Sequence, residues 1–138
     1  MLLFVVLFIL AALAALALFF TREDPRITRL KVKYYSFIKT LPEKYSMLKT
    51  PFLITGTYGG DIGTNVNKGG EIFICLDGDD NDHMHVLLHE LAHSTVTEYD
   101  HTTKFWNNFK ELKELAQARG LYTLVESKKY CGKEISDS

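Results

Sequence analysis

Apolar and polar residues are distributed unevenly along the chain, because the first twenty positions are almost entirely apolar. Residues 1–20 contain no charged side chain and consist mainly of Leu, Ala, Phe, Val and Ile. A helix rises 1.5 Å per residue, so this segment would cover about 30 Å, the thickness of a membrane's hydrocarbon core. A cleaved signal peptide would have a basic start, a shorter apolar run and a small-residue exit, whereas this segment ends Leu18-Phe19-Phe20. We therefore expect a retained transmembrane anchor at residues 1–20.

The residues that follow the anchor alternate between polar and apolar with the period of a helix. Pro25 suits a first helical turn, and the apolar positions behind it recur at helical spacing. These positions are Ile27, Leu30 and Tyr34. Pro42 and Pro51 bracket a further short segment, which predicts one or two more helical turns. We expect residues 21–51 to form a juxtamembrane helical segment.

A different pattern begins at residue 52, where short runs rich in β-branched and aromatic residues alternate with glycine-rich stretches. Residues 52–55 and 71–76 are strand candidates of this kind, and residues 64–66 lie between them as a possible third strand. The sequence Asn67-Lys68-Gly69-Gly70 is typical of a turn. The pattern predicts a small sheet of about three strands.

Two longer helices are expected after this sheet. Apolar residues at helical spacing predict one near residues 82–96, behind several N-cap candidates, and a second at residues 103–119 that ends before Gly120. Residues 127–138 are polar and charged, and we expect them to form a frayed tail. The complete pattern predicts an α+β fold whose folded core spans residues 52–126.

The charged residues all lie beyond Phe20 and nearly balance, with 16 Lys plus Arg against 17 Asp plus Glu. This balance does not indicate a strongly basic surface, so a nucleic-acid partner is not expected. Several basic residues follow the anchor directly, and such residues favour the cytoplasmic side of a membrane. They are Arg22, Arg26, Arg29, Lys31 and Lys33. We expect a single-pass membrane protein whose C-terminal domain is cytoplasmic.

The chain has two cysteines, Cys75 and Cys131, which are the only candidates for a disulfide. Cys75 lies in an apolar run, and this position favours a buried free thiol. A buried thiol would agree with a reducing compartment.

The candidate chemistry is concentrated in the pentapeptide His89-Glu90-Leu91-Ala92-His93. Residues four apart on a helix lie on the same face, so His89 and His93 can direct ring nitrogens at a single ion. Two imidazoles and one further protein ligand hold Zn²⁺ in catalytic sites and leave a position for water. Glu90 lies beside that position, where a carboxylate can act as the general base. The pentapeptide therefore indicates a zinc hydrolase.

The third zinc ligand must come from elsewhere in the chain, and His101 is the favoured candidate. A turn after the motif helix can bring its ring back toward His93. A rival class of enzyme uses a Glu from the next helix, for which Glu111 and Glu114 are candidates. His85 precedes His89 by one turn, and we expect it to cap the helix or to support a ligand by hydrogen bonding.

Three stretches of the chain resemble the WLM (Wss1-like) metallopeptidases, which are relatives of the SprT/Spartan-like proteases. They are the glycine-rich strand and turn at residues 63–72, the motif at residues 87–93, and the sequence from His101 to Phe105-Trp106. The resemblance implies a minimal zincin-like fold, in which the small sheet precedes the motif helix and a C-terminal helix. It also implies that His89, His93 and His101 bind zinc and that Glu90 is the catalytic base. The family usually has a shorter interval before the third His, with a glycine in it.

Two functional hypotheses follow from these observations. The first is a membrane-anchored zinc metalloendopeptidase that cleaves protein or peptide substrates, with Glu90 as the base acting on zinc-bound water. A tyrosine hydroxyl would then help to hold the oxyanion, and the candidates are Tyr58, Tyr99 and Tyr122. The alternative is a catalytically inactive, zinc-stabilised structural or adaptor protein anchored in the membrane, whose fourth zinc position would be closed. Glu90 favours the enzyme, because a structural zinc site needs no base.

Overall fold

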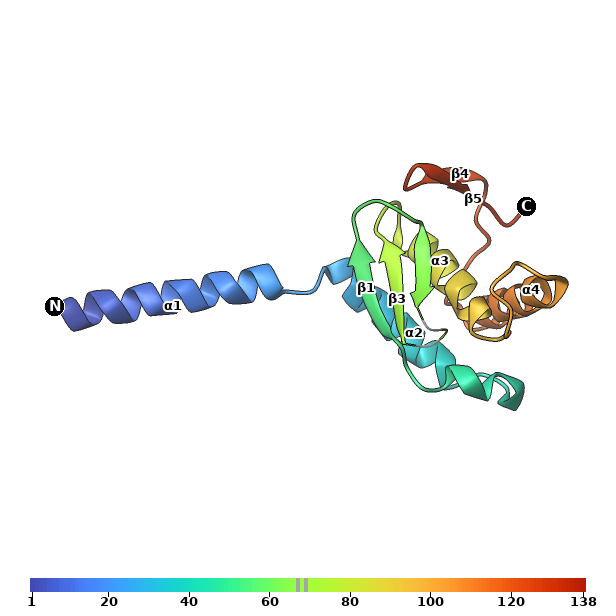
Figure 1. Ribbon diagram of the computed structural model, residues 1–138, viewed down its shortest axis with the longest axis horizontal. Coiled ribbons are helices and arrows are strands. Elements are labelled where there is room, and N and C mark those ends of the chain that lie inside the picture. Colours follow the sequence, from blue (N-terminus) through green and yellow to red (C-terminus); the bar gives the residue numbers. More distant parts are fainter. Residues whose placement is uncertain (67, 69) are drawn as a thin grey trace.

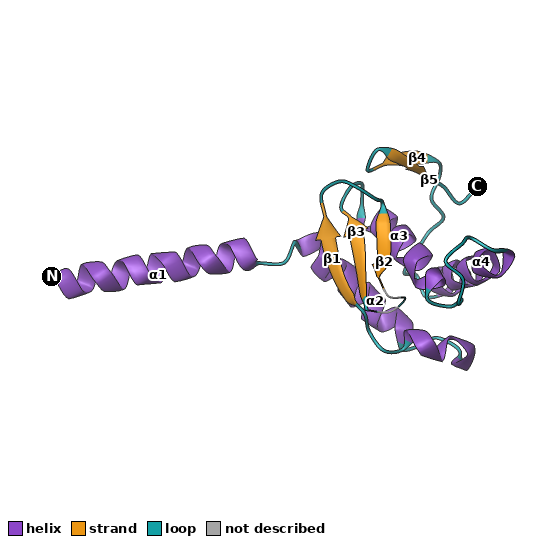
Figure 2. Ribbon diagram, in the orientation of Figure 1, coloured by secondary structure: helices purple, strands orange, loops and turns teal. Residues whose placement is uncertain are grey.

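The chain has an α+β fold in the computed structural model, which describes residues 1–66, 68 and 70–138 (Figure 1). Helix α1 (Leu2–Thr21) extends away from the remaining elements, which gather around one small sheet (Figure 2). The elements after α1 are α2 (Pro25–Ile38), the 3₁₀ helix η1 (Glu43–Leu48), β1 (Leu53–Thr57), β2 (Gly63–Val66), β3 (Glu71–Cys75), α3 (Asp80–His93), α4 (Thr103–Ala118), β4 (Lys128–Tyr130) and β5 (Lys133–Ile135). The predicted α+β class is confirmed.

Helix α1 is the one described helix that is long and apolar enough to cross a membrane, over Leu2–Phe20. None of this apolar window is buried against the rest of the protein. An isolated helix with apolar side chains on every face needs an apolar environment, which a bilayer supplies. The apolar helix is thus present as expected, and a membrane span and a signal sequence both have this character.

Helix α2 belongs to the core of the folded domain. Its start is set by Asp24, whose side chain accepts a hydrogen bond from the Arg26 backbone N–H at 2.9 Å, and by Pro25 in the first turn. Its buried face contains Ile27, Leu30, Tyr34, Phe37 and Ile38, and it packs on β1 and α3. The Tyr34 hydroxyl accepts a hydrogen bond from the Phe52 backbone N–H at 2.9 Å, which ties α2 to the chain just before β1.

The sheet has the strand order β1-β3-β2, with β1 parallel to β3 and β2 antiparallel to it. Ile54, Ile72 and Ile74 face the core, where α2 packs on β1, and α3 packs on β2 and β3. Strand β2 is therefore an edge strand that lies directly beside the motif helix (Figure 2). The predicted three strands are confirmed, while the predicted turn at residues 67–70 lies partly outside the described residues.

The C-terminal residues do not fray, so this expectation is wrong. Strands β4 and β5 form an antiparallel hairpin in which Tyr130 and Ile135 are buried. Lys128 adds an ion pair to Asp82 on α3, with Nζ and Oδ2 2.6 Å apart. The sequence pattern missed this hairpin because two buried side chains among many polar ones give too weak an alternation.

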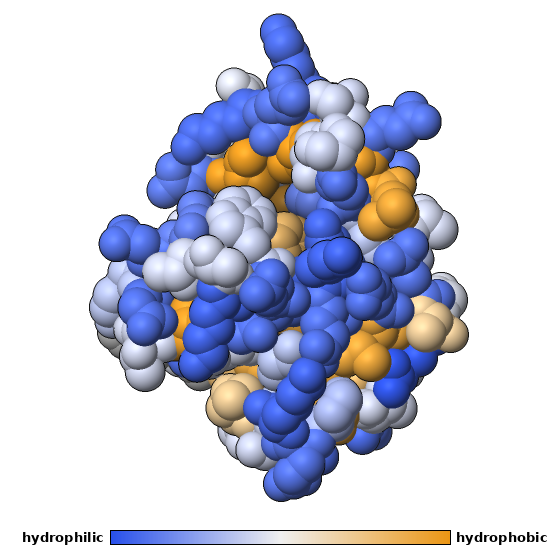
Figure 3. Space-filling model, turned by 90° about the vertical axis from the view of Figure 1, so that its right-hand side faces the viewer, coloured by the Kyte–Doolittle hydropathy of each residue, from blue (hydrophilic) through white to orange (hydrophobic). Residues whose placement is uncertain are grey.

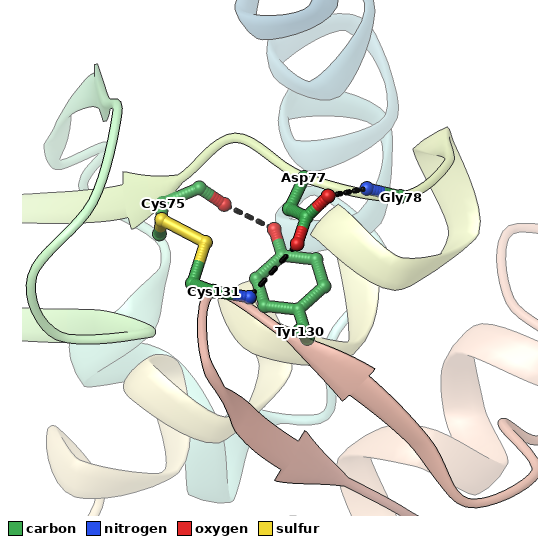
Figure 4. Close-up of a disulfide and its surroundings, with 5 residues drawn as sticks. All are labelled: Cys75, Asp77, Gly78, Tyr130 and Cys131. Carbon is green, nitrogen blue, oxygen red and sulfur yellow. Dashed lines mark hydrogen bonds between the residues drawn. A yellow bond between two sulfur atoms is a disulfide. The ribbon is translucent and has the colours of Figure 1, made fainter.

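The hairpin is bonded covalently to the sheet by a disulfide between Cys75 and Cys131 (Figure 4). The Tyr130 hydroxyl donates to the Cys75 carbonyl, and the Cys131 backbone N–H donates to the Asp77 carboxylate at 2.8 Å. Cys75 is buried as expected, but the prediction of a free thiol is wrong. The partners lie 56 residues apart, and only the folded chain brings them together.

Candidate metal centre

The motif helix α3 begins in a capping box, which fixes where it starts and hence where the motif lies. The Asp79 side chain accepts from the Asp82 backbone N–H at 2.9 Å, and the Asp82 side chain accepts from the Asp79 backbone N–H at 3.0 Å. Helix α3 ends at His93, with Ser94 as its C-cap. His89 and His93 therefore project from its last turn, where the chain turns toward α4.

The structure brings together the three histidines that the sequence suggests as ligands. One ring nitrogen from each of His89, His93 and His101 lies within 4.8 Å of the others. The Nε2 atoms of His93 and His101 are 3.1 Å apart. Three imidazoles that converge in this way form a donor set suited to Zn²⁺. These residues fit the metal that the resemblance implies.

The rival glutamate ligands are not part of this cluster. The Glu111 carboxylate lies 2.6 Å from Lys44 Nζ, an ion pair that connects α4 to η1. Glu114 is exposed on α4 and lines a second cavity, together with Lys110 and Gln117, that contains none of the three histidines. Within the described part of the chain, the candidate metal-binding group consists of the three histidines.

The surroundings keep the helix histidines in the neutral form that binds metals. Burial, followed by the neighbouring His93 and His101, lowers the pKa of His89 to about 3. Burial and then His101 lower the pKa of His93 to about 4. A neutral imidazole has a free lone pair, so near neutral pH no proton has to leave these rings before an ion binds.

Glu90 lies in the same pocket as His89 and His101, and only 6% of its surface is exposed. Burial, and then the nearby Asp61, raise the pKa of its carboxyl to about 7. No hydrogen bond or ion pair to this carboxylate is present among the described residues. An acid that is buried yet unpaired beside a histidine cluster is typical of a catalytic position.

Gly63 allows the edge strand to approach this acid, a role that sequence reasoning did not assign. A Cβ at position 63 would lie 2.7 Å from Val86 Cγ1 and 2.9 Å from Glu90 Oε1. These distances are shorter than any real Cβ contact, so a side chain here would displace Glu90 or the strand. Gly63 is the first residue of β2 and of the stretch at residues 63–72 that carries the family resemblance, and this position was the signal available in the sequence.

Asn65 and Lys68 bind the first half of the loop that carries His101, and neither residue was assigned this role from sequence. Asn65 Nδ2 donates to the Glu90 carbonyl at 2.8 Å and to Ser94 Oγ at 2.6 Å. Lys68 Nζ donates to the Val96 carbonyl at 2.7 Å and also to the Glu98 carbonyl. These bonds fix the course of the loop from Ser94 to Glu98, shortly before His101.

Aromatic residues of α4 line the side of the cluster that faces this helix. The ring centroids of Phe105 and Phe109 lie 5.1 and 5.2 Å from that of His89. Trp106 contacts both His89 and His101, yet 49% of its surface remains exposed. Trp106 thus packs against α3 through the histidine rings, at the edge of the pocket.

The remaining sequence candidates occupy different places. His85 Nδ1 lies 2.8 Å from the Tyr122 hydroxyl, which in turn donates to Asp137, so both residues are held in a buried polar cluster. Tyr58 donates to Asp24 at 2.8 Å and lines a different cavity, together with Asp24 and Ile27. Tyr99 lines the cleft that contains Glu90, His93 and His101. Of the three tyrosines suggested for the oxyanion, Tyr99 is the one that lines a cleft with these residues.

The fold and the cluster define an α+β domain with a candidate three-histidine metal site on its motif helix. The chain matches the WLM domain family over residues 33–138, and it therefore belongs to that family. It is also 39% identical over 77 residues to the uncharacterized protein 136R of Invertebrate iridescent virus 6. That match covers 48% of this chain and 43% of the viral protein, so the chain spans less than half of its relative. No solved structure matches the chain.

Proposed function

We propose that this chain is a zinc-dependent metalloendopeptidase of the WLM family that acts on protein or peptide substrates. The observation that carries the proposal is the convergence of His89, His93 and His101 beside Glu90, which is buried and has no partner among the described residues. A buried carboxylate without a partner costs stability, and such groups are most common at functional sites, which supports proton transfer at a metal site as the role of Glu90. Membership of the WLM family supports the same reading.

The three histidines would hold the ion, and Glu90 would move the proton. Bound zinc would supply a Lewis acid that polarises water and the scissile carbonyl. Glu90 would accept a proton from the attacking water and return it to the leaving amine. Tyr99 is the candidate to donate a hydrogen bond to the oxyanion, because it lines the cleft with the cluster.

The test compares the whole 138-residue chain with Glu90→Gln and with Glu114→Gln, an exposed acid outside the cluster. Each protein is assayed for bound zinc and for hydrolysis of an unfolded protein such as casein. We expect Glu90→Gln to keep its zinc and to lose at least about 100-fold in turnover, and Glu114→Gln to resemble the unmodified chain. Full turnover in Glu90→Gln would contradict the enzyme proposal. Bound zinc without turnover in any variant would favour the structural alternative.

We further propose that residues 1–20 anchor this domain in a membrane and that the domain faces an oxidising compartment. The basic residues after the anchor led to the opposite, cytoplasmic expectation. The disulfide carries more weight, because paired cysteines rarely persist in a reducing compartment. The basic side chains of Arg26 and Arg29 are also engaged within the domain, by Asp24 and Asp80.

The side of the membrane can be tested by alkylating intact cells with a mass-tagged maleimide before and after reduction. Our proposal predicts that Cys75 and Cys131 gain the tag only after reduction. Labelling of both cysteines before reduction would instead place the domain in a reducing compartment.

A further inference from the structure

A pocket of about 360 Å³ lies beside the histidine cluster, and the C-terminal hairpin supplies part of its lining. His89, Glu90 and His101 contribute the chemistry-bearing side chains, and residues 133–136 contribute the hairpin side. The volume lies within the range of pockets that enclose a small ligand. Figure 3 views the molecule from the end opposite α1 and shows apolar atoms exposed between polar ones in its upper part.

Away from the cluster the lining has an apolar part and a polar part, and the polar part includes Asp61 and His85, whose Nδ1 is paired with the Tyr122 hydroxyl. The apolar part is the one that could bind an apolar side chain. Ile62, Val86, Phe109 and Ile135 contribute to it, and Trp106 stands half-exposed at its edge. A large apolar side chain that entered this space would leave water and contact aliphatic and aromatic surfaces, which is favourable in proportion to the area buried.

The charged and polar groups on the hairpin side are already partnered within the chain. Lys133 Nζ lies 3.3 Å from Asp61 Oδ1, and the Glu134 carboxylate accepts a hydrogen bond from the Ser127 hydroxyl. A charged substrate side chain would have to compete with these existing partners for a counter-charge. Apart from the cluster and Glu90, the pocket therefore offers a charged side chain less than it offers an apolar one.

The hairpin side of the pocket is held in place by interactions that do not involve the cluster. The Cys75–Cys131 disulfide and the Tyr130 hydrogen bond fix one end of the hairpin. Beyond β5, the Asp137 carboxylate lies 2.8 Å from Lys113 Nζ and accepts from the Val125 backbone N–H at 2.6 Å. A wall fixed at both ends is preorganised, so binding against it orders little of the chain.

We propose that the hairpin and α4 form a subsite for a bulky apolar side chain of the substrate, with Ile135 and Trp106 as specificity-determining residues. This inference rests on the proposed function, because a bound peptide is a substrate only if the chain is a peptidase. Binding of an apolar side chain in this pocket needs neither turnover nor metal. The two proposals can therefore fail separately.

Trp106 is the only tryptophan of the chain, so its fluorescence reports directly on this pocket. The whole chain carrying Glu90→Gln is placed in lipid nanodiscs and titrated with capped pentapeptides Ala-Ala-X-Ala-Ala, with and without zinc. The residue X is Leu, Phe, Asp or Lys. We expect the Leu and Phe peptides to bind at least about tenfold more tightly than the charged ones. Empty nanodiscs provide the blank.

Ile135→Ala should reduce this preference at least about threefold, whereas Val125→Ala should leave it unchanged. Val125 is a matched control, because it is a buried aliphatic residue near the hairpin and does not line the pocket. Thermal unfolding shows whether both variants fold. Should Ile135→Ala fail to fold, Phe109→Leu, which changes the α4 side, is expected to reduce the preference instead.

Equal binding of apolar and charged peptides, or no binding at all, would overturn the subsite. An equal loss in Ile135→Ala and Val125→Ala would overturn the assignment of Ile135. Apolar preference that persists without zinc supports the subsite even if the zinc assay of the proposed function fails.

Discussion

The two ends of helix α3 treat their polar side chains in opposite ways. At the first turn, Asp79 and Asp82 satisfy each other's backbone groups, and Asp82 also pairs with Lys128. At the last turn, His89 and His93 converge with His101, and the Glu90 carboxylate has no partner in the described part of the chain. The first arrangement stabilises the helix, while the second leaves three converging imidazoles and one buried carboxylate available for a ligand.

This contrast distinguishes residues that stabilise the fold from residues that the fold holds in position for a function. The acids of the first turn complete hydrogen bonds that any helix start requires. At the last turn His89 and His93 are half-buried, and Glu90 is buried with no side-chain partner among the described residues. Burial moves the pKa of Glu90 up and those of His89 and His93 down. Such shifts are most common at functional sites.

The largest expected effect comes from breaking the cluster at its third member. His101→Ala should lower zinc affinity at least about 100-fold, because it removes one of three protein ligands. Glu111→Ala, which removes the pair with Lys44 and the interaction with Tyr45 but no member of the cluster, should leave affinity unchanged. Competition with a fluorescent chelator measures both. Normal affinity in His101→Ala combined with a loss in Glu111→Ala would move the site to the glutamate class.

The disulfide lies near the first turn of α3, and removing it should lower stability without changing metal binding. The double variant Cys75→Ser/Cys131→Ser should unfold with about 2–4 kcal/mol less free energy, because the unfolded chain is freed from a cross-link across 56 residues. Denaturant unfolding of the zinc-free protein measures this loss. Zinc affinity should stay within about twofold, and a loss as large as that of His101→Ala would show that the two ends are not independent.

Gly63 offers a way to disturb Glu90 without touching a ligand. Gly63→Ala should lower stability by about 1–3 kcal/mol and reduce turnover, because its Cβ would meet Val86 and the Glu90 carboxylate. Adding Val86→Ala removes one of the two clashes. The double variant should then regain part of the unfolding free energy that the clash with Val86 costs, while turnover stays low. Recovery of both would show that the Glu90 contact is unimportant.

The smallest effect is expected from His83. It lies in the first turn of α3, where Asp79 and Asp82 are hydrogen-bonded but, among the described residues, the His83 ring is not. Its ring is buried against Tyr130, and within the described part of the chain neither ring nitrogen has a hydrogen-bond partner, although Nδ1 lies 3.9 Å from Asp80 Oδ1. Burial lowers its pKa despite the neighbouring Asp77, Asp80 and Asp82. The unfolded chain therefore binds a proton near pH 6.5 that the folded chain does not accept, so His83 lowers stability as the pH falls below that value.

The contribution of His83 can be isolated by comparing unfolding free energies at pH 7.5 and 5.0. His83→Phe should lose less stability on acidification than the unmodified zinc-free chain, by at most about 1.4 kcal/mol per pH unit. An identical pH dependence in both proteins would show that His83 is protonated in the folded state.

The motif helix and its candidate ligands could be predicted from the sequence, because their geometry depends on residues close together in the chain. His89, Glu90 and His93 follow from helical spacing, and His101 is only eight residues further on. The strands were found for the same reason, as short runs of β-branched and aromatic residues. Gly63 and Asn65 belong to the stretch that carries the family resemblance, but their contacts with Glu90 and Ser94 depend on the packing of β2 against α3.

The C-terminal hairpin was out of reach because its stabilising contacts are distant in the chain. Cys131 pairs with Cys75, Lys128 with Asp82, and Tyr130 with the Cys75 carbonyl, all more than 40 residues away. The local pattern of this segment is polar, and it contains little apolar surface of its own. Its contribution to the pocket could therefore not be expected from sequence.

The most direct test of the contrast between the ends of α3 is X-ray absorption at the zinc edge of the zinc-loaded chain. The proposed site predicts three imidazole ligands and one further light atom, with no sulfur. The spectrum should be the same in Cys75→Ser/Cys131→Ser, and one imidazole should be lost in His101→Ala. Sulfur in the coordination sphere, or a fourth protein ligand that closes the site, would contradict a catalytic metal at the last turn of α3.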